Sequence, residues 1–190
     1  LARAAGARRI VVNTHYRADQ MAAHLQGSGV LISPEPGTIL ETGGGLRAAL
    51  PLLGSGPVAV LNSDAIWTGR NPLLELAQAW DTARMETLLL LLSADQARGP
   101  GAKGDFRLDD QGRIARGLGG EDQVYLGASI IDPARLATIP DPVFSLNRPW
   151  NDMIAAGTAF GALHQGKWCD VGHPEGIAQA EALLHSARHD

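Results

Sequence analysis

Short apolar runs rich in β-branched residues recur along the first half of the chain, and stretches with helical spacing separate them. The runs predict strands at 10–13, 30–32, 58–61 and 87–92, and the spaced stretches predict helices at 17–25, 46–50 and 72–83. Short strands that alternate with helices of about ten residues are typical of a parallel sheet covered on both faces. This half of the chain therefore predicts an α/β layered fold.

The second half has more antiparallel character. Residues 104–114 are typical of a β-hairpin that turns at Asp110-Gln-Gly112, and 124–131 predict a further strand. A helix at 151–156, strands at 160–163 and 167–171 and a closing helix at 174–187 complete the pattern. We therefore expect a mixed, mainly parallel central sheet flanked by helices, in a single domain over residues 1–190.

Two of the expected helices carry more detailed predictions. The glycines at 43–45 predict a flexible turn ahead of the helix at 46–50, which Pro51 helps to end because proline has no N–H to donate. The helix at 72–83 has Pro72 in its first turn, and its apolar residues are spaced to form one buried stripe. The stripe consists of Leu73, Leu76, Ala77 and Trp80.

The bulk composition narrows the class of protein. With 190 residues, 45% of them hydrophobic, the chain is long enough for one substantial core. The net charge of −4 and the scattered arginines argue against a nucleic-acid partner, and no apolar run approaches the roughly 20 residues that span a bilayer. The single cysteine, Cys169, excludes an internal disulfide framework and fits a reducing, cytoplasmic location.

Two aspartates follow apolar runs at distant places in the chain. Asp64 ends the run Pro57-Val-Ala-Val-Leu-Asn-Ser-Asp64, and Asp170 lies in Trp168-Cys-Asp-Val-Gly172. Mg²⁺ prefers oxygen ligands and is commonly held by one or two carboxylates together with substrate phosphates. Asp64 also has a plain interpretation as a turn or capping residue, and Asp170 as a loop end. The pair at strand ends nevertheless predicts a phosphate-handling enzyme.

A glycine-rich segment, Glu41-Thr-Gly-Gly-Gly45, is the second candidate site. Successive glycines let backbone N–H groups approach a ligand closely, and the N-terminus of a following helix favours negative charge. The same triplet is common in plain turns, and it has the spacing of neither a P-loop nor a dinucleotide fingerprint. The residues alone leave both interpretations open.

Five segments occur in a characteristic order. They are Glu41–Gly45, Leu61-Asn-Ser-Asp64 with Trp67 after it, Lys103-Gly-Asp-Phe-Arg-Leu108, Tyr125-Leu-Gly-Ala-Ser-Ile130 and Trp168–Gly172. Their order and approximate spacing resemble the sugar-1-phosphate nucleotidyltransferase family over essentially the whole chain. Within it they are most similar to N-acetylmuramate-1-phosphate uridylyltransferases and mannose-1-phosphate guanylyltransferase-like members.

The resemblance implies a fold and a reaction. The fold is the Rossmann-like layered type of nucleotide-diphospho-sugar transferases. The reaction joins a nucleoside triphosphate to a sugar 1-phosphate, with Mg²⁺ as cofactor, and gives a nucleotide-sugar and pyrophosphate without a covalent enzyme intermediate. Such chemistry depends on in-line positioning and on neutralising charge at phosphorus.

The resemblance also implies roles for individual residues. Asp64 and Asp170 correspond to the two metal carboxylates and are the expected catalytic residues. The expected nucleotide-binding residues are Glu41, Thr42, Gly43, Gly44 and Gly45, which would lie along the base. The expected substrate-binding residues are Lys103, Gly104, Asp105, Gly127 and Asn151.

Several of these residues also have a purely structural interpretation. Gly104 and Gly127 would then be strand glycines at a bulge, and Lys103 and Asp105 would be solvated hairpin charges. Asn151 is better explained as the N-cap of its helix than as a sugar-binding residue. For the glycines and the charges, the residues favour neither interpretation.

Other residues of chemical interest favour an ordinary structural role. His185 and His189 have metal-ligand spacing but no third ligand, so we expect a solvated helix end. Cys169 has no adjacent base and is expected to be a buried thiol. Trp67 and Trp168 are expected in the core.

One element of the family does not occur in this sequence. It is a glycine-rich loop of the kind Leu-Ala-Ala-Gly-x-Gly-x-Arg, followed by a Pro-Lys segment, which grips the triphosphate. Leu1–Arg9 has no initiator Met and is instead typical of the last turns of a helix that ends near Gly6. We therefore expect that the natural protein extends upstream, and that the 190-residue form lacks transferase activity and is poorly stable alone.

Three functions remain open at this stage. The first is a nucleotidyltransferase with UTP as the favoured nucleotide, since the Glu41–Gly45 variant is most similar to uridylyltransferases. The second is a guanylyltransferase that acts on mannose 1-phosphate. The third is a non-catalytic, regulatory nucleotide-sugar-binding protein of the same fold. The oligomeric state is not predicted.

Overall fold

A computed structural model describes residues 1–98, 104–118 and 122–187. The chain divides into two units. The first unit comprises Leu1, Ala59–Ile131 and Met153–Asp190, and the second comprises Ala2–Val58 and Asp132–Asp152. Each unit has its own sheet and helices, and each is described by itself.

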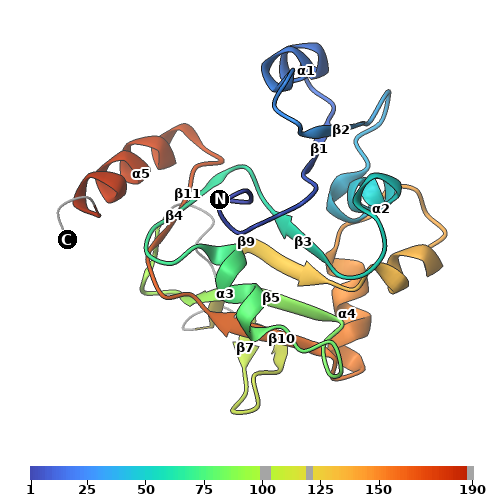
Figure 1. The fold of residues 1–190 in the computed structure, drawn as a ribbon. Coiled ribbons are helices and arrows are strands. Elements are labelled where there is room, and N and C mark those ends of the chain that lie inside the picture. The colour runs from blue at the N-terminus through green and yellow to red at the C-terminus, as the bar shows by residue number, and fades with distance from the viewer. Residues whose placement is uncertain (99–103, 119–121, 188–190) are drawn as a thin grey trace. The chain divides into compact units, whose positions relative to one another are not determined.

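The main sheet of the first unit is built around a fully apolar central strand, β5 (Thr87–Ser93). Leu88–Leu92 are at most 2% exposed, as expected for a strand covered on both faces. On one side β5 pairs in parallel with β10 (Ala159–Leu163), and on the other it pairs antiparallel with β9 (Gln123–Ile131). The expected mixed sheet with flanking helices is therefore confirmed (Figure 1).

The remaining strands of this sheet attach to β9. The strand β3 (Val58–Leu61) pairs with β9, and a hairpin of β7 (Phe106–Leu108) and β8 (Ile114–Arg116) continues the order as β10-β5-β9-β7-β8. The hairpin turn forms as predicted, because the Asp109 carboxylate accepts hydrogen bonds from the N–H groups of Gln111 and Arg113. Antiparallel pairs are thus at least as prominent as parallel ones in the described part of the sheet.

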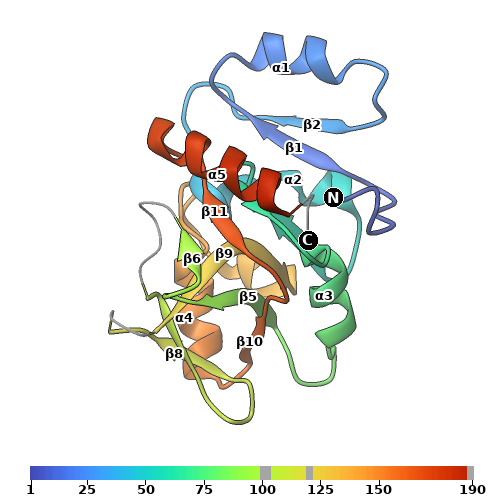
Figure 2. The ribbon, with the colours of Figure 1, turned by 90° about the vertical axis from the view of Figure 1, so that its left-hand side faces the viewer.

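A smaller three-stranded sheet completes the first unit. In it β11 (Trp168–Asp170) lies between β4 (Ala65–Trp67) and β6 (Ala97–Arg98), antiparallel to β4 and parallel to β6. The helix α5 (Pro174–Ser186) follows β11 closely in sequence and packs beside it (Figure 2). Both late strands and the closing helix were predicted from the apolar pattern.

The helix α3 (Pro72–Ala79) packs against β5, β9 and β10, and it differs from its prediction. Leu73 and Leu76 are buried, as expected, and Asn71, for which no role was predicted, caps the helix. It ends four residues early, however, because Trp80 is extended and Asp81 starts a separate turn by accepting a hydrogen bond from Ala83 N–H. The predicted stripe is therefore wrong at Ala77, which is exposed, and at Trp80, which follows the helix.

The second unit contains a two-stranded parallel sheet of β1 (Val11–Thr14) and β2 (Leu31–Pro34), joined by α1 (Ala18–Leu25). These three elements were predicted. The unit also contains α2 (Glu41–Leu53), which packs against β1 and β2, and a 3-10 helix, η1 (Pro133–Thr138). The chain returns to the first unit within α4 (Asn147–Ala155).

The turn at residues 2–7 has the hydrogen bonds of a helix C-terminus. Gly6 N–H donates to Arg3 O and Ala7 N–H donates to Ala2 O, while Gly6 has a φ of +80°. The structure describes residues 2–6 as turn and has no helix there, so the predicted helix end near Gly6 stays a prediction. In the described part of the chain, no helix combines the length and apolar character that a membrane crossing requires.

The glycine triplet is not a flexible turn, and this prediction is wrong. Gly43, Gly44 and Gly45 lie inside α2 and are buried. The N–H groups of Gly43 and Gly44 both donate to Phe144 O, and a Cβ on Gly43 would lie 2.8 Å from the same oxygen. Gly43 and Gly44 are needed because residues 142–144 pack directly on the helix backbone, and Gly45 because a Cβ there would lie 2.7 Å from Glu35 Oε1.

Two further boundaries differ from the prediction. Pro51 does not end α2, which continues to Leu53 and stops at Gly54, whose φ is +97°. The helix α4 begins at Asn147, whose N–H donates to Ser145 Oγ, so Asn151 lies inside the helix. The expected N-cap at Asn151 is therefore wrong.

The packing of α2 predicts an unusual response to a glycine-to-alanine change. Within a helix, alanine is normally more favourable than glycine by about 1 kcal/mol. In Gly44→Ala the added methyl group would overlap the Pro142 carbonyl oxygen. We expect the free energy of unfolding to fall by about 1–3 kcal/mol in a urea titration.

The exposed Ala48 of the same helix provides the control. Ala48→Gly should lower the free energy of unfolding by only about 1 kcal/mol through helix propensity. A gain of stability in Gly44→Ala would contradict the close packing.

Candidate active site

The turn after β3 presents the first candidate carboxylate. Asn62 N–H donates to Gly127 O over 2.7 Å, which holds the end of β3 against β9. Asp64 follows two residues later, immediately before β4, and is exposed. The predicted position of Asp64 at the end of an apolar strand is therefore confirmed.

Strand pairing brings the second carboxylate to the same place. In the antiparallel pair β4/β11, Asp170 lies opposite Ala65, and Val171 N–H donates to Asp64 O over 2.9 Å. A Cβ built on Gly172 would lie 3.1 Å from Asp170 Oδ1 and 3.4 Å from Asp64 Oδ2. Gly172 N–H also donates a 2.7 Å hydrogen bond to Asp170 Oδ1. Both carboxylates thus lie beside Gly172, whose missing side chain leaves space next to them.

Gly127 shapes the neighbouring wall. It lies in an irregular part of β9, where Tyr125 and Ser129 pair with Leu91 and Leu89 and leave the residues between them as a bulge. Its φ is +74°, and a Cβ there would lie 2.9 Å from Asn62 Cβ. Gly127 fits both of its interpretations. It is a strand glycine at a bulge, and that bulge borders the carboxylates of the candidate site.

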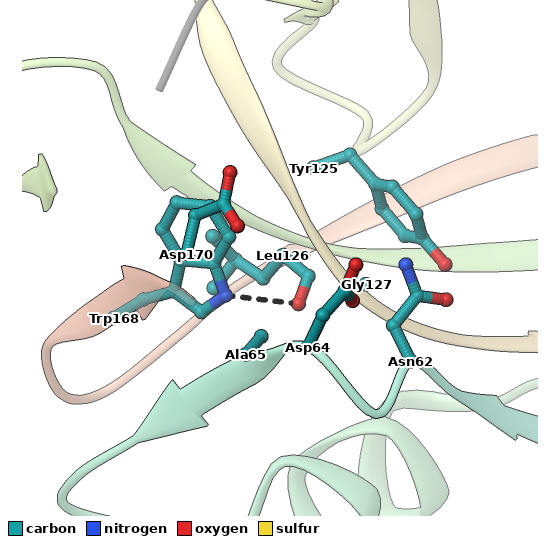
Figure 3. A pocket seen from close by; sticks show the side chains of 8 residues that line it. All are labelled: Asn62, Asp64, Ala65, Tyr125, Leu126, Gly127, Trp168 and Asp170. Atoms are coloured by element: carbon teal, nitrogen blue, oxygen red, sulfur yellow. Dashed lines mark hydrogen bonds between the residues drawn. The ribbon is translucent and has the colours of Figure 1, made fainter. Parts of the chain in front are cut away.

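These residues line one cleft of the first unit, with a volume of about 160 Å³. Its lining consists of Asn62, Asp64, Ala65, Tyr125, Leu126, Gly127, Trp168 and Asp170 (Figure 3). Complete small-molecule sites usually have about 300–1,000 Å³. The cleft therefore has the size for phosphate groups and a cation rather than for a whole nucleotide.

Comparison with known proteins shows the family of the chain. The chain is 38% identical to the N-acetylmuramate alpha-1-phosphate uridylyltransferase of Caulobacter vibrioides, over 97% of this chain and 81% of that protein. It is 29% identical to the enzyme of the same name from Neisseria meningitidis serogroup B, over 94% of this chain and 79% of that protein. The chain belongs to the sugar-1-phosphate nucleotidyltransferase family.

The fold is also shared with solved structures. HddC from Yersinia pseudotuberculosis, solved with and without GMP-PN, superposes with a TM-score of 0.74 over 94% of this chain and 79% of that protein. The sequence identity is 18%, so this likeness concerns the fold alone. No family model matches the chain. The curated relatives show that the protein is a nucleotidyltransferase enzyme.

The charged groups of this nucleotidyltransferase suit a hard cation. In the ranges that the structure describes, no group of three or more His, Cys, Asp or Glu residues is arranged to hold a metal ion. Asp64 and Asp170 offer carboxylate oxygens at one point. Two carboxylates completed by phosphate oxygens and water are the usual environment of Mg²⁺, so the donor set fits that ion.

Tyr125 and Trp168 provide the neutral part of the cleft. Burial raises the pKa of Tyr125 to about 12, and a 3.4 Å hydrogen bond from its hydroxyl to Ser129 Oγ opposes the shift. The phenol therefore stays protonated at neutral pH. Trp168 is 5% exposed and donates from Nε1 to Leu126 O over 3.1 Å, so it belongs to the core, as predicted, and also lines the cleft.

Of the other predicted substrate-binding residues, the three that the structure describes do not line the cleft. Asp105 Oδ2 accepts a 2.9 Å hydrogen bond from Tyr125 N–H, and burial raises the pKa of this carboxyl although that bond and Arg116 lower it. Gly104 packs against Asp122, where a Cβ would lie 2.7 Å from Asp122 Cβ. Asn151 is exposed on α4. Lys103, like His189, lies outside the described residues.

The predicted nucleotide-binding residues belong to the second unit. Glu41 opens α2 with a φ of +59°, a conformation rare outside glycine. Thr42 Oγ1 accepts a hydrogen bond from Leu146 N–H, and the Gly43 and Gly44 amides are bonded to Phe144 O. Because these two amides already donate hydrogen bonds within the protein, a nucleotide base bound along this segment would contact other groups. The role itself stays a prediction.

Among the lining residues that sequence reasoning did not consider, two have polar side chains, Asn62 and Tyr125. Both lie in segments that carry the family resemblance, Leu61–Asp64 and Tyr125–Ile130. The available signal was a polar residue between a strand end and a candidate metal ligand. It was too weak alone, because an amide or a phenol next to a strand is common in proteins of any function.

Cys169 is fully buried in β11 beside the candidate metal ligand. Burial, and secondarily the Asp170 carboxylate, raise the pKa of its thiol, so the reactive thiolate is disfavoured. We expect iodoacetamide at pH 8 to label the native protein slower than the urea-unfolded protein by roughly 100-fold, because labelling requires opening of a core strand. Equal rates in the two states would contradict this burial.

Proposed function

We propose that this nucleotidyltransferase forms a UDP-sugar from UTP and a sugar 1-phosphate with Mg²⁺ as cofactor, and that the sugar is N-acetylmuramate. The observation that carries the proposal is the meeting of Asp64 and Asp170 at Gly172 in a small cleft. The choice of UTP and of the sugar is supported by the names of the two relatives and by the resemblance of Glu41–Gly45 to uridylyltransferases.

In this reaction a phosphate oxygen of the sugar 1-phosphate attacks the α-phosphorus of the nucleoside triphosphate. A bond from phosphorus to oxygen forms, the bond from the α-phosphorus to the bridging oxygen breaks, and pyrophosphate leaves. The attacking group comes from the substrate, so the enzyme needs no nucleophile of its own. This agrees with a cleft whose nearby thiol, Cys169, is buried and protonated.

The residues of the cleft would position the substrates and neutralise the charge of their phosphate groups. Asp64 and Asp170 would hold the cation, which when bound supplies Lewis-acid stabilisation of negative phosphate oxygens. Asn62 and the protonated Tyr125 offer neutral hydrogen-bonding groups at the same cleft. Gly127 and Gly172 leave room where a side chain would fill it.

A substrate panel tests the proposal directly. The full-length natural polypeptide is incubated with Mg²⁺ and each nucleoside triphosphate against N-acetylmuramate 1-phosphate, mannose 1-phosphate and glucose 1-phosphate, and pyrophosphate is measured. We expect the highest rate with UTP and N-acetylmuramate 1-phosphate. A preference for GTP with mannose 1-phosphate would establish the guanylyltransferase instead. Nucleotide-sugar binding without release of pyrophosphate in any combination would favour a non-catalytic binding protein.

The two carboxylates are tested by neutral variants of the same shape. Asp64→Asn and Asp170→Asn should each lower kcat/KM by at least about 100-fold, because each removes a charged metal ligand whose contribution is several kcal/mol. The loss should be smaller at higher Mg²⁺ concentration. Asp110→Asn, which removes an exposed hairpin carboxylate, is the matched control and should retain the normal rate. Activity retained in both cleft variants would refute the metal assignment.

A further inference from the structure

A buried histidine–glutamate pair lies in the first unit among residues that are not part of the cleft. His164 follows β10 directly, and its side chain is fully buried. Its Nδ1 is 2.6 Å from Oε2 of Glu75, a residue of α3 that is 7% exposed. Its Nε2 is 3.1 Å from Thr68 O.

The partners determine where the hydrogens lie. Thr68 O is a carbonyl oxygen and can only accept, so Nε2 of His164 carries a hydrogen. The other Glu75 oxygen, Oε1, accepts a 2.9 Å hydrogen bond from Gln165 N–H, as a carboxylate does. One proton is therefore shared between Nδ1 and Oε2. With Glu75 ionised, both ring nitrogens are donors and every polar atom of the pair has a partner.

This pair ties together the far ends of the two strands that carry the carboxylates. Thr68 follows β4, and residues 164–167 precede β11. Thr68 N–H donates to Lys167 O over 2.9 Å, and Lys167 N–H donates to Thr68 Oγ1 over 3.2 Å. A Cβ on Gly166 would overlap Thr68 O and lie 2.8 Å from His164 Nε2, so the two segments pack as closely as backbone allows.

The pairing of β4 with β11 connects this fixed end of the two strands to the cleft. From the Thr68/Lys167 end, the register runs through Trp67 opposite Trp168 to Ala65 opposite Asp170. Neighbouring side chains of a strand point to opposite faces, so a slip of one residue would turn Asp170 away from Asp64. The geometry of the two carboxylates therefore depends on the register set at the other end.

Stability alone does not explain a buried ion pair at this place. Removing two charges from water costs free energy, and apolar residues of the same volume often serve equally well. What an ion pair adds is a directional set of hydrogen bonds, and here these join α3, the end of β4 and the segment before β11.

We propose that His164 and Glu75 are positioning residues that lock the β4/β11 register and so hold Asp64 and Asp170 at the spacing that binds the metal ion. The inference rests on the proposed metal role of the two aspartates. It concerns contacts within the first unit and requires no contact between either positioning residue and the substrate.

Terbium binding provides a readout other than activity. Tb³⁺ is a hard, oxygen-seeking cation, and Trp168 at the cleft can sensitise its luminescence. In His164→Ala and Glu75→Ala we expect the Tb³⁺ concentration for half-saturation to rise about 10-fold, the lower end of the range for groups that orient metal ligands. The amides of Thr68 and Val171 should also exchange with deuterium faster, because both donate across the ladder.

Two conservative variants sharpen the test. Glu75→Gln can keep all the hydrogen bonds, since its amide donates to Nδ1 of a neutral His164 while its oxygen still accepts from Gln165 N–H. We expect its Tb³⁺ affinity within about twofold of the wild type. His164→Gln fills much of the same volume but cannot donate from two opposite ring positions, so it should behave like His164→Ala. If His164→Ala does not fold, His164→Gln replaces it as the variant that is expected to lose Tb³⁺ affinity.

The control removes a buried hydrogen bond elsewhere in the same unit. Thr87 Oγ1 donates to Ile130 O between β5 and β9, and Thr87→Val should lower the thermal midpoint without changing Tb³⁺ affinity. Unchanged affinity in the His164 and Glu75→Ala variants would overturn the positioning role, as would equal losses in Glu75→Gln and Glu75→Ala. If instead Asp64→Asn and Asp170→Asn leave the luminescence intact, the proposed metal site and the positioning role both fail.

Discussion

The antiparallel pairing of β4 with β11 is the contact on which the candidate active site depends. It places Asp170 opposite Ala65 and therefore beside Asp64, although the two aspartates are far apart in sequence. Without this pairing each carboxylate would be an ordinary acid at the end of a strand. With this pairing, two negative charges face one space at Gly172. Such an arrangement of like charges is stable only with a cation or enough solvent to separate them. This shared space is the reason for proposing a cation between the two carboxylates.

The other described residues that line the cleft carry no charge. Tyr125 is held protonated by burial, and the Cys169 thiol lies inside β11 with its pKa raised. A cleft of this kind offers charge neutralisation and hydrogen bonds and has no nucleophile ready to react. That suits a reaction in which the substrate itself supplies the attacking oxygen, and it agrees with the membership of the chain in the sugar-1-phosphate nucleotidyltransferase family.

Much of the fold follows from local pattern, and the errors have identifiable causes. The buried strand at 87–92, the hairpin at 109–113 and the closing helix were predictable because apolar runs, turn residues and an early proline act over a few residues. The glycines at 43–45 were misread as a turn because helix propensity is a weak local preference. Close packing against residues 142–144, distant in sequence, overrides it at Gly43 and Gly44. Trp80 was assigned to α3 because apolar spacing does not show that Asp81 begins a new turn.

The sequence by itself determined the succession of strands and helices, the two carboxylates at strand ends and the family resemblance that its relatives bear out. Only the tertiary structure decided which strands pair, in what register, and that the glycine triplet is a packing surface within a helix. It also decided that His164 and Glu75 meet in the core. The physical reason is that hydrophobic periodicity reports whether a residue is buried, whereas its partners depend on hydrogen bonds and close packing between segments that local sequence does not relate.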